Sequence, residues 1–116
     1  MNTSCLTKIG FIPASVTESK EITGGFCGDL LSWVMGKAKK GECWFTVIGN
    51  LNTIAVASLV EISAVVLCQG VKLTPDVLKK AEEEDVSVYY TELSVYEAAV
   101  KLHDSLKDST VKDEEG

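Results

Sequence analysis

The sequence predicts an α/β protein with three layers, α/β/α, in which helices cover both faces of a mostly parallel sheet of about five strands. Three nearly continuous apolar runs, Cys43–Ile48, Ala64–Cys68 and Val86–Tyr90, are typical of strands buried on both faces. Helical segments lie between them, and this alternation favours right-handed parallel crossovers. A chain of 116 residues, 46% apolar and 24% charged, has the composition of one domain with a single core.

Weaker signals flank these three runs. Lys8–Pro13 and Glu21–Thr23 are the remaining strand candidates. Asp29 stands where it can cap a helix over Leu30–Lys39, whose acidic start and lysine-rich end both complement the helix dipole. The stretch 107–116 holds one apolar residue among charged and small polar groups. We therefore expect a domain over 1–106 and an acidic tail over 107–116 that frays.

Three more helices are expected after the first strong strand. Asn50 or Asn52 can cap a helix over Thr53–Ile62, and because that helix is apolar nearly all round we expect it to be buried against the sheet or in a subunit contact. Thr74 precedes a proline at the first helical position, which predicts a helix to about Glu84. The sequence 94–97 fits a capping box for the last helix.

The charge of the chain excludes two classes of partner. Its formal net charge is −6 and its pI is about 4.7, so it offers no basic surface to a nucleic acid or to an anionic membrane. We see no charged leader followed by an apolar stretch at the N-terminus, and the longest apolar run, near Ile54–Val60, is too short to span a bilayer. We expect a cytoplasmic protein.

The four cysteines show none of the close pairs that metal sites or redox motifs use. Cys43 and Cys68 lie within apolar runs and are expected to pack in the core. Cys27 stands beside glycines just ahead of a helix, where a thiolate would be stabilised if it were exposed. The single histidine, His103, is distant in sequence, although a pair between Cys27 and His103 could form in space. The sequence indicates no metal site.

Familiar catalytic motifs are missing from the sequence. It contains no GxxxxGK[ST] phosphate loop, no GxGxxG that opens a helix after a strand, and no GxSxG elbow. We therefore expect neither an enzyme nor a resident cofactor.

A ligand would be expected at one rim of such a sheet, because the carboxyl ends of parallel strands meet helix N-termini there. If the Thr-Gly-Gly segment forms a loop on the same rim, backbone donors and polar side chains converge on it. The candidate ligand-binding residues are Thr23, Gly24, Gly25, Asp29, Asn50, Asn52, Gln69 and Thr91. The alternative is that Asn50, Asn52, Thr91 and Ser94 only cap helices and that the glycines only form turns.

The segment EITGGFCGDLLSWVMG resembles the DRTGG domain, a small module named for the peptide that here reads Glu21-Ile22-Thr23-Gly24-Gly25. The resemblance continues through WFTVIGNLNTIAVASL, AVVLCQG and YYTELSVYEAA, and it covers about Leu6 to Leu106. It is greatest to stand-alone members, some of which accompany iron-hydrogenase genes. Relatives occur in phosphotransacetylases and, beside CBS domains, in nucleotide-regulated pyrophosphatases. The non-catalytic N-terminal domain of HPr kinase/phosphorylase is similar in fold.

The resemblance implies a non-catalytic regulatory or accessory domain that senses a small polar ligand, such as a nucleotide or an acyl phosphate, and self-associates as a homodimer. Ile22 occupies the name-giving arginine position, so a guanidinium contact to an anion is not available here. The alternative function is a structural protein–protein interaction module without a ligand, for example in a hydrogenase-linked system. In either case Trp33 and Met35 are the candidate interface residues, with Trp33 as the anchor.

Overall fold

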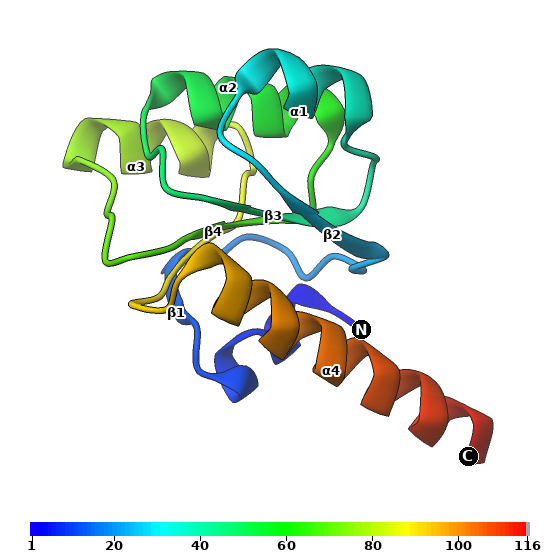
Figure 1. Cartoon of the computed structure of the whole chain (residues 1–116). Coiled ribbons are helices and arrows are strands. Elements are labelled where there is room, and N and C mark those ends of the chain that lie inside the picture. The colour runs from blue at the N-terminus through cyan, green and yellow to red at the C-terminus, as the bar shows by residue number, and fades with distance from the viewer. Residues whose placement is uncertain (116) are drawn as a thin grey trace.

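The computed structural model describes residues 1–115 and shows a five-stranded sheet with helices on both faces (Figure 1). The order of the strands is β1-β5-β4-β3-β2. The four strands β2 to β5 run parallel, and β1 pairs antiparallel with β5. The predicted three-layer α/β/α class is confirmed. The strands are β1 Ile12–Ser15, β2 Gly24–Cys27, β3 Glu42–Thr46, β4 Ala64–Leu67 and β5 Val88–Tyr90.

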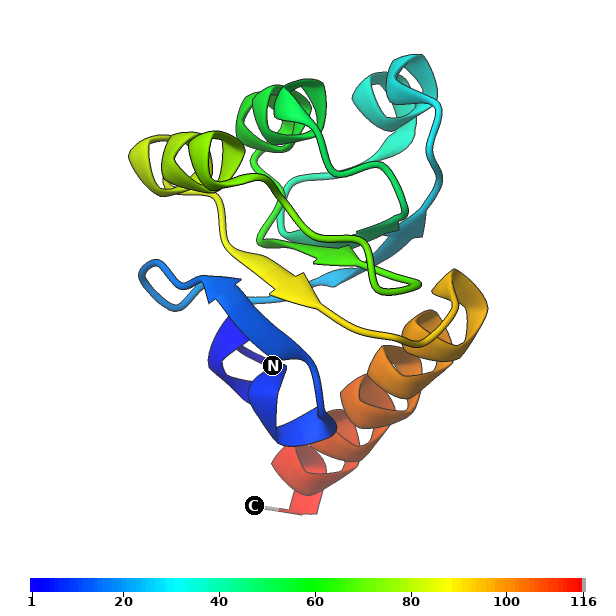
Figure 2. The same ribbon diagram turned by 90° about the vertical axis from the view of Figure 1, so that its left-hand side faces the viewer.

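The helices divide between the two faces of the sheet. Figure 1 shows α1 (Leu31–Lys37), α2 (Leu51–Val60) and α3 (Pro75–Glu83) on one face. The long α4 (Val95–Glu115) lies on the opposite face together with two short 3-10 turns, Thr3–Cys5 and Thr7–Ile9 (Figure 2). Within residues 1–115, no helix combines the length and the apolar character that a bilayer crossing requires.

The core has two halves because the central strands are buried on both faces. Trp44, Val65 and Val88 point to the side of α1, α2 and α3, where they join Val34 and Ile54. The alternate residues of the same strands form the other half, beneath α4 and the N-terminal turns. That half includes Cys43, Phe45, Val66, Cys68, Tyr89 and Leu102. The side chains of the apolar runs that predicted the strands are thus mostly buried, on both faces of the sheet. The predicted placement of Cys43 and Cys68 in the core is confirmed.

Local capping signals are confirmed at two of the helices. The Asn50 side chain accepts a hydrogen bond from the Thr53 amide at 3.2 Å, as an N-cap should. Ser94 and Glu97 form the reciprocal capping box, with both bonds at 3.1 Å. Asn52 lies inside α2 and is exposed, so of the two asparagines only Asn50 is the cap.

Three expectations for the ends of elements are wrong. The N-cap of α1 is Leu30, and the Asp29 side chain instead bonds to β3. The second edge strand begins at Gly24, directly after the predicted Glu21–Thr23. The 3-10 turn ending at Ile9 takes the first two residues of Lys8–Pro13, and β1 begins only at Ile12. At the other end, α4 continues past residue 106 through Glu115, across most of the stretch expected to fray, while Gly116 lies outside the described residues.

Candidate functional site

The sequence-predicted ligand residues do not share one rim, and this part of the prediction is wrong. The Thr23 amide donates to the Gly41 carbonyl at 2.9 Å, just before β3 begins, so Thr23 lies at the edge of the sheet where the parallel strands start. Asp29 contacts Thr46, where β3 ends. We call these the amino edge and the carboxyl edge.

At the carboxyl edge the polar side chains mainly hold the fold together. The Asp29 carboxylate accepts hydrogen bonds from the Thr46 hydroxyl at 2.5 Å and from the Val47 amide at 3.0 Å. The Thr91 side chain is buried and accepts from the Leu93 amide at 3.2 Å. Gln69 is exposed and takes a left-handed backbone conformation, with φ of +61°. A ligand-binding role for these three residues stays a prediction.

The glycines of the Thr-Gly-Gly segment form a strand and not a loop. Gly24 and Gly25 pair with Glu42 and Cys43 in β2, and neither has a positive φ. A Cβ on Gly25 would lie 3.5 Å from Phe45 and 3.6 Å from Leu102 of α4, which are ordinary contact distances, so the packing of α4 on this edge strand does not require glycine. Ile22, at the arginine position of the DRTGG peptide that the segment resembles, is 3% exposed and packs in the core beneath the sheet.

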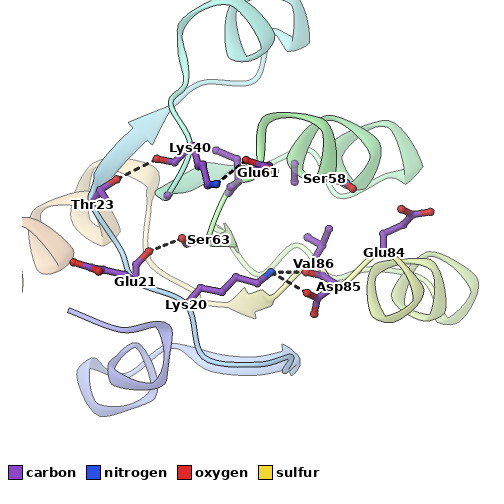
Figure 3. Close-up of a pocket in the computed structure, with 13 residues that line it drawn as sticks. Lys20, Glu21, Thr23, Lys40, Ser58, Glu61, Ser63, Glu84, Asp85 and Val86 are labelled. Carbon is purple, nitrogen blue, oxygen red and sulfur yellow. Dashed lines mark hydrogen bonds and ion pairs between the residues drawn. The ribbon is translucent and has the colours of Figure 1, made fainter.

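A cavity of about 640 Å³ opens at the amino edge, and we call it the amino-edge pocket (Figure 3). It lies between the β1–β2 connection, the C-terminal ends of α2 and α3, and the starts of the parallel strands. A volume of this size is typical of small-molecule sites. Of the predicted ligand residues only Thr23 lines it. The lining residues are Lys20, Glu21, Thr23, Lys40, Gly41, Ala57, Ser58, Glu61, Ile62, Ser63, Glu84, Asp85 and Val86.

Two lysines from different connections reach the ends of the two helices (Figure 3). Lys40 Nζ lies 3.2 Å from the Glu61 carboxylate after α2. Lys20 Nζ donates to the Asp85 carbonyl after α3 at 2.5 Å and lies 3.8 Å from the Asp85 carboxylate. Two lysine–acid pairs at the pocket therefore join segments that are distant in sequence.

Both of these acids occupy backbone positions that normally favour glycine. Glu61 and Asp85 have φ of +63° and +58°, and each follows a helix whose last turn closes with a six-to-one backbone bond, from Ile62 to Ala57 and from Val86 to Ala81. A side chain in this conformation is strained, and a carboxylate at a helix C-terminus also opposes the helix dipole. Two such departures at one cavity are typical of functional sites.

The amino-edge acids and lysines were missed by sequence reasoning, although one signal was available. Each helix ends without a glycine, at Glu61 and at Asp85, where a glycine would be expected. Gly41 gave a weaker signal. It has φ of +87°, and a Cβ there would lie 2.9 Å from the Thr23 hydroxyl, so the wall of the pocket needs glycine at this position.

Cys27 and His103 line a second cavity, of about 250 Å³, between β2 and α4. The two side chains do therefore approach one region of the molecule. However, partial burial raises the pKa of the Cys27 thiol above its ordinary value of 9.0. The desolvation that raises this pKa favours the neutral thiol, so it opposes a stabilised thiolate at Cys27, which stays a prediction although the side chain is exposed.

The predicted interface residues lie on the surface of α1. Trp33 and Met35 are 59% and 52% exposed, and the preceding Leu30 is 59% exposed. The Lys37 ammonium lies 5.8 Å from the centre of the Trp33 ring, which is the distance of a cation–π contact. The exposure fits an interface, and the interface itself stays a prediction.

Comparison with known proteins establishes the fold. No protein-family model matches the chain, and no curated protein sequence matches it either. Among solved structures it resembles the CBS and DRTGG domains of the regulatory region of Clostridium perfringens pyrophosphatase, complexed with the activator diadenosine tetraphosphate. The TM-score is 0.64 at 10% identity, over 80% of this chain and 41% of that one. The chain thus spans less than half of that regulatory region, and a DRTGG-like fold is supported.

Proposed function

We propose that this chain is a non-catalytic regulatory or accessory domain that binds a small polar ligand in the amino-edge pocket and self-associates. The observation that carries the proposal is the pocket itself. It has the volume of a ligand site, and its polar groups come from four separate parts of the chain. The fold shared with a regulatory region that binds a nucleotide activator supports the same function.

The arrangement of the polar groups supports binding without catalysis. Ser63 Oγ donates to the Glu21 carbonyl at 2.6 Å, and Thr23 Oγ1 donates to the Lys40 carbonyl at 3.3 Å, so both hydroxyls are held by backbone oxygens and not by a general base. The thiol of Cys27 and the imidazole of His103 line the other cavity. The two hydroxyls of the amino-edge pocket can recognise a ligand, and neither is arranged as an activated nucleophile.

The pocket is placed to report its occupancy to the rest of the domain. Lys20 ties the β1–β2 connection to the end of α3, and Lys40 ties the α1–β3 connection to the end of α2. A ligand that contacts Lys20 or Lys40 would alter the lysine–acid pairs that join the ends of α2 and α3 to the connections before the strands. Because α1 and α2 share one face of the sheet, the exposed Trp33 lies on the layer that such a change would move.

A ligand screen with a blocked pocket tests the proposal. ATP, AMP, acetyl phosphate and agmatine are each added at millimolar concentration, and the thermal midpoint is measured. A ligand at 100 times its dissociation constant stabilises the folded state by about 2.7 kcal/mol, which is readily detected. ATP, AMP and acetyl phosphate represent the nucleotides and acyl phosphates that the resemblance implies, and agmatine is a cationic probe.

Two tryptophan variants of α2 make the screen specific. Ser58 lines the pocket, whereas its neighbour Leu59 points to solvent and is 69% exposed. We expect at least one probe to raise the midpoint of the wild type and of Leu59→Trp but not of Ser58→Trp. If no probe shifts the wild type, or if Ser58→Trp responds equally, the proposed ligand site is wrong.

The alternative function, an interaction module without a ligand, is favoured by one observation, the apolar surface of α1. Leu30, Trp33 and Met35 are all more than half exposed there. In this case the amino-edge pocket would be only structural, and partner binding would be insensitive to Ser58→Trp and sensitive to Trp33→Ala. A hydrogenase-linked partner remains a proposal on the same footing.

A further inference from the structure

The charges of the amino-edge pocket are unequal. Its lining has two lysines, Lys20 and Lys40, and four carboxylates, Glu21, Glu61, Glu84 and Asp85, so two positive charges face four negative ones and the sum is −2. Lys80, outside the lining, pairs with Glu84 at 3.0 Å and compensates one carboxylate in part. The pocket as a whole is acidic.

The backbone adds to this negative potential. α2 and α3 both end at the pocket, and the C-terminus of each helix carries the equivalent of about half a negative charge. The Asp85 carbonyl already binds one ammonium group, that of Lys20. This bond shows which chemistry the helix end accepts, since carbonyl oxygens are acceptors only.

Between the charged groups the pocket has an apolar surface. Ala57, Ile62 and Val86 line it, and the side chains of all three are otherwise part of the core. This surface suits a short aliphatic stem. These side chains are at most 3% exposed, so a stem lying against them would gain mainly contact, and it brings no polar group that must be left without a partner.

A phosphate group fits the pocket poorly. It carries nearly two negative charges, and it would have to take Lys20 and Lys40 away from Asp85 and Glu61. Both carboxylates would then lose their partners beside two helix C-termini and a third acid, Glu21. A cationic group instead meets carboxylates without displacing either lysine.

We infer that the ligand of the amino-edge pocket is a small organic cation, with an ammonium or guanidinium group on a short aliphatic stem. This inference rests on the proposed function, since it names the ligand class of the same pocket. One cationic group lies beside Glu84 and the end of α3, the stem lies on the apolar surface, and a second cationic group at the other end of the stem lies toward Glu21, on the opposite side of the pocket (Figure 3).

The test measures the affinity of agmatine, a guanidinium and an ammonium group on a four-carbon stem, by isothermal titration calorimetry. ATP and acetyl phosphate are the anionic probes. Removing one carboxylate near the cation should weaken agmatine binding by about fivefold or more, since fivefold corresponds to two unit charges about 4 Å apart at the dielectric constant of water, and a lower surface dielectric gives a larger loss. The variants are Glu21→Gln and Glu84→Gln, and added salt should weaken binding as well.

Glu92→Gln is the matched control. It removes the same charge from an exposed residue of the carboxyl edge, so it measures the general attraction of a chain with net charge −6 for cations. We expect Glu92→Gln to bind agmatine with wild-type affinity. If Glu92→Gln weakens binding as much as the pocket variants do, the cation is a diffuse counter-ion and the inference is overturned.

The anionic probes separate this inference from the proposed function. If ATP or acetyl phosphate binds and agmatine does not, with loss of binding in Lys20→Ala, then the pocket is a ligand site of the opposite charge. The inference then fails while the proposed function stands. If none of the probes binds, both fail.

Discussion

Glu61 provides a substitution whose effects on stability and on ligand binding should have opposite signs. The residue follows α2 with φ of +63°, and its carboxylate pairs with Lys40 at the amino-edge pocket. Replacing Glu61 by glycine keeps the backbone conformation and the bond from the Gly41 amide to the Glu61 carbonyl, because both depend only on the main chain. Only the strain and the carboxylate are removed.

The magnitude can be worked out from the local structure. Relief of the left-handed strain is worth about 1–2 kcal/mol. The greater flexibility of glycine in the unfolded chain reduces this gain in stability by roughly 0.5–1 kcal/mol. The ion pair between Glu61 and Lys40 is exposed, with side-chain exposures of 61% for Glu61 and 79% for Lys40, so losing it should cost about 0.2–1 kcal/mol of stability. Removing an acid from a helix C-terminus gains a similar amount, so these two effects offset each other. We expect Glu61→Gly to be more stable by about 0.5–1 kcal/mol, or roughly 2–6 °C in thermal midpoint.

The assay is urea denaturation of Glu61→Gly beside Ala55→Gly, followed by agmatine titration of both. Ala55 is an exposed residue within the same helix, where glycine should cost about 1 kcal/mol. We expect Glu61→Gly to gain stability and bind agmatine more weakly, and Ala55→Gly to lose stability with unchanged binding at temperatures where it is folded. A destabilised Glu61→Gly would refute the strain argument, and full agmatine affinity would show that this carboxylate does not serve the ligand.

Three other predictions concern different parts of the chain. Asp29→Ala should cost about 2 kcal/mol in urea denaturation, because the Thr46 hydroxyl and a strand-end amide lose a charged acceptor, and unchanged stability would contradict the assignment. Burial, followed by nearby negative charges, raises the pKa of Cys68 from 9.0 to about 11. The unfolded thiol ionises first, so the contribution of Cys68 to stability should be constant below about pH 9 and be lost as pH rises toward 11. Stability in this window should fall less steeply in Cys68→Ala, and an equal slope in the two proteins would exclude Cys68 as the cause. Trp33→Ala should keep its fold and lose self-association in sedimentation velocity, whereas Tyr96→Ala, which removes a 78% exposed aromatic from α4, should not.

The fold could be predicted because its strongest signals are local or are repeated along whole elements. Strand β4 is apolar at every position and β3 at its three central positions, and that pattern identifies strands with two covered faces wherever they pair. The caps at Asn50 and Ser94 were recognised because donor and acceptor are three residues apart, so the sequence alone brings them together.

The site could not be predicted in the same way because it depends on contacts between distant residues. Asp29 has the spacing of a helix cap, yet its acceptor is used by β3, 17 residues away. The edge strand Gly24–Cys27 has neither an apolar run nor β-branched residues, so nothing marked it as a strand. That single error moved Thr23 from the amino edge to the carboxyl edge in the prediction.

The two borders of the sheet differ in a way that limits how copies of this domain can join. β1 carries Pro13, which has no amide hydrogen to offer a further strand, whereas β2 reads Gly-Gly-Phe-Cys and carries neither proline nor charge. Strand addition is therefore open at one border only. If two molecules paired through their β2 edges, neither would have a free edge left. A continuous sheet built in this way therefore ends at a dimer and cannot grow into a fibre.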